Sequence, residues 1–140
     1  MGTQGRLTDS FKTELVARGY AAWNEDDLEG LLALCHPAVI YHASGVFPGM
    51  EPVYEGEQGM RRFWSTFREP WSEIKVIPEE IVERGDLVAI LLRFEGTGRD
   101  GIETSMRFIN TVEIRDRRAY RFRALPYSPE AARELGLESG

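Results

Sequence analysis

The sequence predicts an α+β fold in which N-terminal helices cover one face of an antiparallel sheet. Helix-like apolar patterns dominate the first half of the chain, and four strand-like runs joined by short turns make up most of the second half. A chain of 140 residues can bury a core but is short for two domains. We therefore expect one domain over residues 1–140, with flexible ends at about 1–7 and 137–140.

Two helices are expected before the first strand. The first begins at Thr8 or Asp9, either of which can cap free amides, and runs to about Trp23. The second is short, covers 27–35 (DLEGLLALC), and must end before Pro37 because the residue preceding a proline disfavours helical geometry.

A strand at 38–44 (AVIYHAS), a Gly- and Pro-rich loop and a short extended piece at 53–55 come next. The run 56–71 (GEQGMRRFWSTFREPW) then has the most pronounced pattern in the chain. On a helix it places four large apolar side chains on one face and ends in a further tryptophan: Met60, Phe63, Trp64, Phe67 and finally Trp71. Such a face meets either a packed core or the lining of a cavity, and large rings suit both.

The second half reads as a meander of four strands. They are expected at 72–83, 87–98, 102–115 and 119–128, with turns at 84–86, 99–101 and 116–118. A short terminal helix over 128–137 begins with a proline in its first turn and ends near Gly136.

Composition and charge argue against several classes of function, namely membrane, nucleic-acid and metal binding. With 42% apolar and 29% charged residues, and no apolar run near the roughly 20 residues that span a membrane, the chain is typical of soluble globular proteins. The first residues lack the apolar stretch of a secretory signal, so we expect a cytoplasmic protein that does not bind membranes. A net charge of −6 argues against nucleic-acid binding. The lone Cys35, with His36 and His42 as the only histidines, gives no convincing metal site.

The order of these elements resembles the NTF2-like cone, and within it the SnoaL-like and ketosteroid-isomerase-like group. Three pieces carry the likeness: 20–45 (YAAWNEDDLEGLLALCHPAVIYHASG), 54–67 (YEGEQGMRRFWSTF) and 108–123 (FINTVEIRDRRAYRFR). The resemblance covers nearly the whole chain and implies a strongly bent antiparallel sheet that encloses a conical pocket with the N-terminal helices. A small apolar or aromatic molecule would be its ligand. The rings expected around it are those of Tyr20, Trp23, Tyr41, Phe63, Trp64, Phe67, Trp71 and Phe108.

His42 is the candidate general base. Alternation in the strand 38–44 separates Tyr41 from His42, and the sequence does not decide which of them faces the pocket. The resemblance puts His42 where ketosteroid isomerases carry the carboxylate base that moves a proton beside a carbonyl, work that an imidazole can do at neutral pH. The alternative is a polar strand residue that hydrogen-bonds to the following loop.

Asn110 is the candidate hydrogen-bond donor. In SMRFINTVEI the alternation marks an inner face on which Asn110 is the one polar residue among apolar ones. A buried amide must be hydrogen-bonded, so it either ties the sheet together or donates into the cavity. The resemblance places Asn110 where the isomerases have the protonated acid that binds the developing oxyanion.

The sequence also departs from these relatives. The position of the isomerases' principal tyrosine is Gly19, with Tyr20 one residue along, and the essential aspartate of SnoaL-like cyclases corresponds to Ala124. Two functions therefore stay open: a cofactor-independent isomerase or cyclase, and a non-catalytic ligand-binding or assembly module. An interior closed by its own rings is a third possibility. We also expect a homodimer through the sheet face that carries Ile109, Thr111, Glu113, Arg121 and Arg123.

Overall fold

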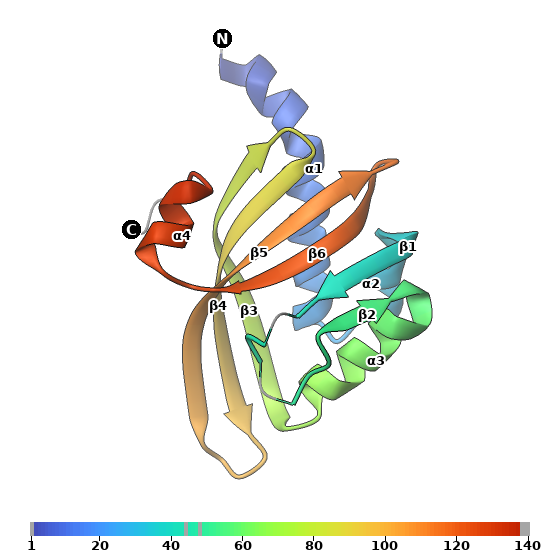
Figure 1. Cartoon of the computed structure of the whole chain (residues 1–140), viewed down its shortest axis with the longest axis vertical. Coiled ribbons are helices and arrows are strands. Elements are labelled where there is room, and N and C mark those ends of the chain that lie inside the picture. Colours follow the sequence, from blue (N-terminus) through green and yellow to red (C-terminus); the bar gives the residue numbers. More distant parts are fainter. Residues whose placement is uncertain (1, 44, 48, 138–140) are drawn as a thin grey trace.

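The structure is a computed structural model that describes residues 2–43, 45–47 and 49–137 (Figure 1). Its elements, in chain order, are α1 (Gly2–Asn24), α2 (Leu28–Ala33), β1 (Cys35–His42), β2 (Val53–Glu55), α3 (Gly56–Arg68), β3 (Trp71–Arg84), β4 (Leu87–Gly98), β5 (Glu103–Arg115), β6 (Arg118–Pro126) and α4 (Pro129–Glu134). The expected α+β class is confirmed. Helix α1 begins at Gly2, within the end expected to be flexible, while residues 138–140 lie outside the described part.

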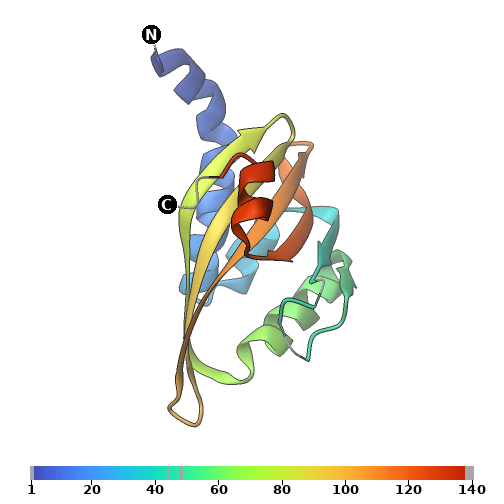
Figure 2. The same ribbon diagram turned by 60° about the vertical axis from the view of Figure 1, so that its left-hand side comes forward.

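The six strands form one curved, open sheet in the order β2-β1-β6-β5-β4-β3. Neighbouring strands are antiparallel except β1 and β6, which run parallel and join the first strand to the C-terminal meander. Helices α1, α2 and α3 cover the inner face of the sheet, and α4 packs on the opposite, outer face (Figure 2). Among the described elements, α4 alone covers the outer face of the meander, and it does so over part of its length.

Helix α3 presents the aromatic face that its sequence predicts. Met60, Phe63, Trp64 and Phe67 are all buried against the inner face of the sheet and α1. Burial of side chains of this size stabilises the fold by about 1.5–3 kcal/mol each. The helix ends at Arg68 because Pro70 has no amide with which to continue the ladder, so Trp71 starts β3 instead of extending the helical face.

Strand β1 begins earlier than the sequence suggests. The pattern of 27–35 predicts a helix as far as Cys35, but α2 ends at Ala33 and Cys35 pairs with Ala119 of β6. Asp27 caps α2 by accepting a 2.9 Å hydrogen bond from the amide of Gly30. Pairing with β6 supplies backbone partners that outweigh the weak helical preference of a short segment.

Strand β3 is one edge of the sheet, and a side chain of α1 hydrogen-bonds to its backbone. The side-chain amide of Asn24 donates to the carbonyl of Val76 (3.0 Å), and its oxygen accepts from the Val76 amide (2.7 Å). Pro78, which has no amide proton, lies two residues further on, next to a break in the pairing register with β4. Near the middle of β3, the backbone groups of Val76 are thus bonded to Asn24, and Pro78 offers no amide for pairing.

The outer face carries a second, smaller apolar cluster. Ala89, Leu91 and Ile109 of the sheet pack against Ala132 and Leu137, and all five are buried. Part of the surface expected to form a homodimer is therefore covered by the chain itself. The half with Glu113, Arg121 and Arg123 is the part where a dimer would have to form, and the homodimer stays a prediction. No helix in the described part of the chain is both long and apolar enough to span a membrane.

Candidate functional site

A small internal cavity of about 30 Å³ lies between the helices and the inner face of β1, β5 and β6. Apolar side chains and Gly19 make up most of its wall, and three polar residues, Tyr20, Tyr41 and Asn110, interrupt it. A water molecule needs roughly 10–15 Å³ by this measure, so the cavity holds about two waters. It is a mostly apolar cavity with one polar cluster, and it is much smaller than the pocket that the sequence led us to expect.

The three polar side chains form one hydrogen-bonded cluster. The amide nitrogen of Asn110 donates to the hydroxyl oxygen of Tyr20 over 2.9 Å. The hydroxyl of Tyr41 donates to the amide oxygen of Asn110 over 3.4 Å, a weaker contact. The Tyr20 oxygen is thus an acceptor in the cluster, and no acceptor for its own proton occurs among the described residues. That proton is available to a guest in the cavity.

Three separate elements bring the cluster together. Tyr20 lies on the buried stripe of α1, four residues from Val16 and three from Trp23. Tyr41 belongs to the inward-facing set of β1, and Asn110 is the polar member of the inner face of β5, as its sequence pattern predicts. A hydrogen bond between residues 20 and 110 therefore ties the first helix to the middle of the sheet.

Burial keeps both hydroxyls protonated. Removal from water raises the pKa of Tyr20 and of Tyr41 well above the ordinary value of a tyrosine, and the hydrogen bonds of Asn110 offset this only in part. At neutral pH both residues are neutral hydrogen-bond donors. Neither can serve as a resting general base.

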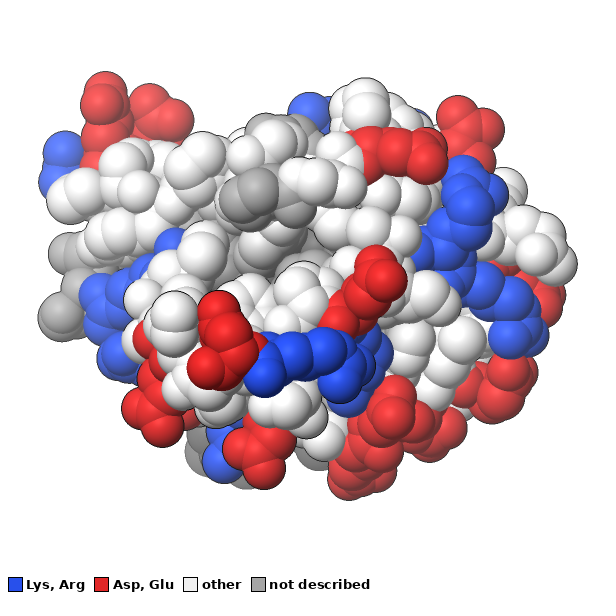
Figure 3. Space-filling model, turned by 90° about the horizontal axis from the view of Figure 1, so that it is seen from below, with Lys and Arg blue, Asp and Glu red and all other residues white. Residues whose placement is uncertain are grey.

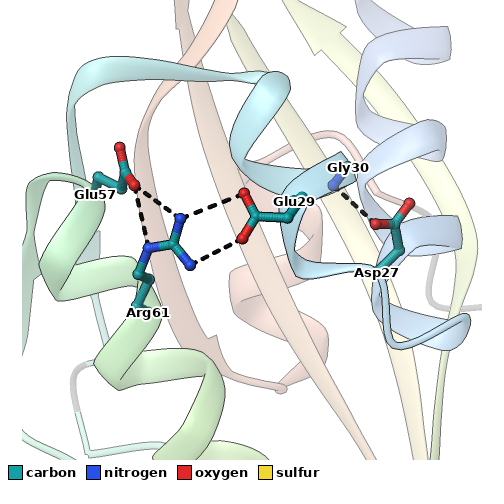
Figure 4. Close-up of polar contacts among 5 residues, drawn as sticks. All are labelled: Asp27, Glu29, Gly30, Glu57 and Arg61. Atoms are coloured by element: carbon teal, nitrogen blue, oxygen red, sulfur yellow. Dashed lines mark hydrogen bonds and ion pairs between the residues drawn. The ribbon is translucent and has the colours of Figure 1, made fainter.

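The helices that wall the cavity are tied together at the surface. Arg61 of α3 bridges Glu57 of its own helix and Glu29 of α2, with its shortest contacts at 2.8 and 2.9 Å (Figure 4). Each exposed ion pair contributes little, but a shared guanidinium fixes the relative position of the two helices. The same two helices contribute Leu31 and Met60 to the cavity lining.

The structure does not bring His42 to the cavity. Tyr41 and Ala43 point inward and are buried, whereas His42 lies on the outer face, opposite Arg123 of β6 and Val53 of β2. Partial burial lowers the pKa of His42, and the charges of Arg123 and Arg121 lower it further. His42 and Asn110, the two predicted catalytic residues, are therefore on opposite faces of the sheet, and a catalytic role for His42 stays a prediction.

The predicted ring residues divide into two groups. Tyr20, Trp23 and Tyr41 line the cavity. Behind it Trp23 stacks on Trp64 (centroids 4.2 Å apart) and Tyr41 stacks on Phe63 (4.0 Å). The remaining predicted rings, Phe67, Trp71 and Phe108, form a second group together with two rings that were not predicted, Phe94 and Phe47.

Two features escaped the sequence analysis. Tyr20 and Tyr41 were expected to act as apolar walls, yet their hydroxyls are what gives the cavity its chemistry. The signal was the single amide on the inner face of β5, which required polar partners. Phe47 lies in the loop between β1 and β2, where no periodicity indicates the direction of a side chain.

Metal binding and thiol chemistry find no support at this site. Within the described ranges, no three His, Cys, Asp or Glu side chains lie close enough together to hold a metal ion. Burial raises the pKa of the Cys35 thiol to about 12, so it packs as a small apolar group and is not a nucleophile at neutral pH.

Comparisons with known proteins agree with the fold. The family model described as the SnoaL-like domain matches residues 16–122. TerC, co-crystallised with polyporic acid, is 25% identical over 90% of this chain and 98% of its own, with a TM-score of 0.77. An NTF2-like protein of unknown function from Burkholderia pseudomallei is 24% identical over 90% and 98% (TM-score 0.76). IdmH from Streptomyces antibioticus, a proposed polyketide cyclase, is 24% identical over 81% and 89% (TM-score 0.69).

No curated protein sequence matches the chain significantly. The family model nevertheless spans most of the sequence, including α1 from Val16, helices α2 and α3, and the sheet as far as Phe122 of β6. Together with the shared architecture of the solved structures, this match shows that the chain belongs to the SnoaL-like family, within the NTF2-like fold.

Proposed function

We propose that the protein binds a small, largely apolar carbonyl compound in its interior and promotes proton transfer at the carbon beside that carbonyl, as an isomerase or cyclase. The observation that carries the proposal is the arrangement of Tyr20 and Asn110. The Asn110 amide donates to the Tyr20 oxygen and leaves the Tyr20 proton for an acceptor in the cavity. A carbonyl oxygen is such an acceptor.

The cluster suits an oxygen on which negative charge develops. When a proton leaves the adjacent carbon, charge moves to the carbonyl oxygen as the enolate forms. A donor fixed in an apolar, water-poor site stabilises that charge more than water does, because it needs no reorganisation. Asn110 acts as a positioning residue, since its hydrogen bond fixes the Tyr20 hydroxyl and strengthens it as a donor.

The cavity lining contains no carboxylate and no imidazole among its described residues. A site of this kind suits a substrate whose carbon acid is already activated, such as a carbon between two carbonyl groups, so that water can accept its proton. Membership in the SnoaL-like family and the likeness to IdmH, a proposed polyketide cyclase, support this choice of chemistry. That TerC was crystallised with an organic ligand supports binding of small molecules.

The test compares Tyr20→Phe with the wild type. The assay is enzyme-dependent exchange of the central carbon-bound protons of 1-phenylbutane-1,3-dione for deuterium, followed by NMR and corrected for the uncatalysed rate. Removal of one donor of this type lowers kcat by roughly 10²–10³-fold. Tyr120→Phe is the matched control, because Tyr120 lies near the protein surface beside Arg115. Equal rates for Tyr20→Phe and the wild type would exclude the proposed role.

A second candidate is a non-catalytic ligand-binding module. The absence of a base from the described lining favours it. In that case Tyr20→Phe weakens binding of the diketone, measured by calorimetry, while the wild type produces no exchange above background. The two functions thus differ in the exchange rate and not in the affinity.

A further inference from the structure

Phe47 lies in the middle of the second ring group. Its ring lies 4.8 Å from that of Phe67, 5.1 Å from that of Phe108 and 6.5 Å from that of Phe94, all edge-on. The three walls come from α3, β5 and β4 and are buried. Edge-to-face geometry on three sides is a favourable environment for any aromatic ring and is not specific to phenylalanine.

Phe47 differs from these walls in how it is held. It is half-buried and comes from the connection between β1 and β2, whereas its three neighbours stand on regular elements. Gly45 and Gly49 flank it with positive φ angles of 73° and 80°, which glycine adopts without strain. At the base of the connection the Ala43 amide donates to the Pro52 carbonyl (2.9 Å), so this closing contact does not involve Phe47.

Figure 3 shows the molecule from below, and a hollow with uncharged residues along most of its border lies near the middle of the view. Phe108 and Asn110 stand two residues apart on the same inner face of β5, about 7 Å at the usual rise of a strand. Phe63 continues the row of rings, 5.8 Å from Phe67 and 4.0 Å from Tyr41. The box of rings around Phe47 is thus adjacent to the Tyr20 and Asn110 cluster.

We propose that the place occupied by the Phe47 ring is an aryl-binding subsite, which an aromatic ring of the ligand takes over when Phe47 swings out. The inference rests on the proposed function, because it assigns the remainder of a ligand whose oxygen is bound by Tyr20. The subsite would add room beyond the cavity of about 30 Å³, which by itself is smaller than the roughly 300–1,000 Å³ of pockets for such ligands. The ligand would carry an aromatic ring and, one ring further on, a carbonyl oxygen.

Phe47 then competes with the ligand for the same box. The apparent affinity of a protein whose binding-competent state is only partly populated falls by the fraction populated. Phe47→Ala removes the competitor and leaves the walls intact. We expect this variant to bind 4-acetylbiphenyl at least about tenfold more tightly than the wild type by calorimetry. Met50→Ala, in the same connection and also packed on the core, is the control and should change the affinity by less than about twofold.

A second probe tests whether the subsite prefers aromatic rings. In 4-cyclohexylacetophenone the terminal ring is saturated, so the gain from Phe47→Ala should be several-fold smaller than for 4-acetylbiphenyl. Equal gains for both probes, or unchanged or weaker binding of 4-acetylbiphenyl to Phe47→Ala, would overturn the aryl subsite. Phe47→Leu, which keeps an apolar side chain, gives the same comparison if the alanine variant is poorly folded.

The experiments can contradict the aryl subsite without contradicting the binding of an oxygen by Tyr20. If 4-acetylbiphenyl binds neither form while cyclohexanone still binds in a manner that Tyr20→Phe weakens, the aryl subsite is wrong and the proposed function stands. If neither ketone binds either form, both are wrong. A crystal structure of Phe47→Ala with 4-acetylbiphenyl should place the terminal ring between Phe67 and Phe108.

Discussion

The side-chain amide of Asn110, in the middle of β5, donates a 2.9 Å hydrogen bond to the hydroxyl of Tyr20 on α1. The two residues lie 90 positions apart in the sequence, and both are buried. Because apolar groups surround them, the bond both ties the first helix to the sheet and gives the cavity its polar point. Stability and ligand binding therefore depend on the same pair.

Asn110→Ala should destabilise the fold by about 1–3 kcal/mol, because it leaves two buried hydroxyls without their partner. Urea unfolding measures the change. The neighbouring Thr111→Val, on the other face of β5, is the control, and we expect it to cost less. If Asn110→Ala unfolds at the same urea concentration as the wild type, the cluster contributes nothing to the stability of the native state.

Tyr20 and Tyr41 should resist ionisation in alkali. Burial raises the pKa of both hydroxyls, so below their folded-state pKa they stay protonated at pH values where tyrosines in an unfolded chain, near pH 10, ionise. The unfolded protein should show the phenolate absorbance of all five tyrosines. The absorbance of the native protein should be lower by the contribution of at least two tyrosines. A full signal from the native protein would contradict their burial.

The same shift has a defined effect on stability. A group whose folded pKa lies above its unfolded value favours the native state at low pH and loses that contribution as the pH rises past the unfolded value. The free energy of unfolding should therefore decline above about pH 10, and less steeply in Tyr41→Phe. Tyr120→Phe should follow the wild type.

His42 should lower the stability of the protein at acidic pH, whereas the tyrosines lower it at alkaline pH. Its folded pKa is lowered below the ordinary value of 6.5, first by partial burial and then by Arg123 and Arg121. The unfolded chain therefore binds the proton more readily, so the stability contribution of His42 is lost as the pH falls through about 6.5. The melting temperature should fall less between pH 7 and 5.5 in His42→Gln than in the wild type.

The position of His42 also predicts its effect on catalysis. Because it lies on the outer face, His42→Ala should leave the exchange rate within about threefold of the wild type, whereas a positioned base usually contributes 10²-fold or more. A loss of that larger size would restore the interpretation of His42 as the base.

The uncovered half of the outer face should support a homodimer. Glu113 lies opposite Arg121 on the neighbouring strand, and Arg123 follows on the same face, so a twofold axis can pair carboxylates with guanidinia. Analytical ultracentrifugation should show about twice 15.9 kDa at micromolar concentration. Arg121→Glu with Arg123→Glu should shift the protein toward the monomer, and a wild type that is monomeric throughout would refute the interface.

The local elements of this fold could be predicted from the sequence because each has one buried face. Alternation identified the inner side of β5, and helical spacing identified the buried face of α3. The same reasoning could not orient β1, because Ile40 and Val39 are both apolar and give neither face a distinct pattern. The parallel pairing of β1 with β6 decides that question, and pairing between distant segments leaves no local signal.

The candidate site could be predicted only in part, for a related reason. Asn110 stands out in its own strand, but its partner Tyr20 looks like one more ring on an amphipathic helix. Phe47 belongs to a loop whose side-chain directions depend entirely on tertiary contacts. Resemblance to relatives suggested His42, since it aligns an imidazole with their base, yet the facing of a strand is a property of the whole sheet.

The contact of Asn24 with Val76 affects whether β3 can pair with a strand of another molecule. An amide side chain that both donates to and accepts from one backbone residue imitates the peptide group of an incoming strand. An exposed edge of 14 residues is otherwise a template on which a second molecule can add and start a fibril. With Asn24 in place and no amide at Pro78, a foreign strand finds no continuous row of partners on β3. The first helix thus occupies the β3 edge at the point where a strand of a second molecule would pair.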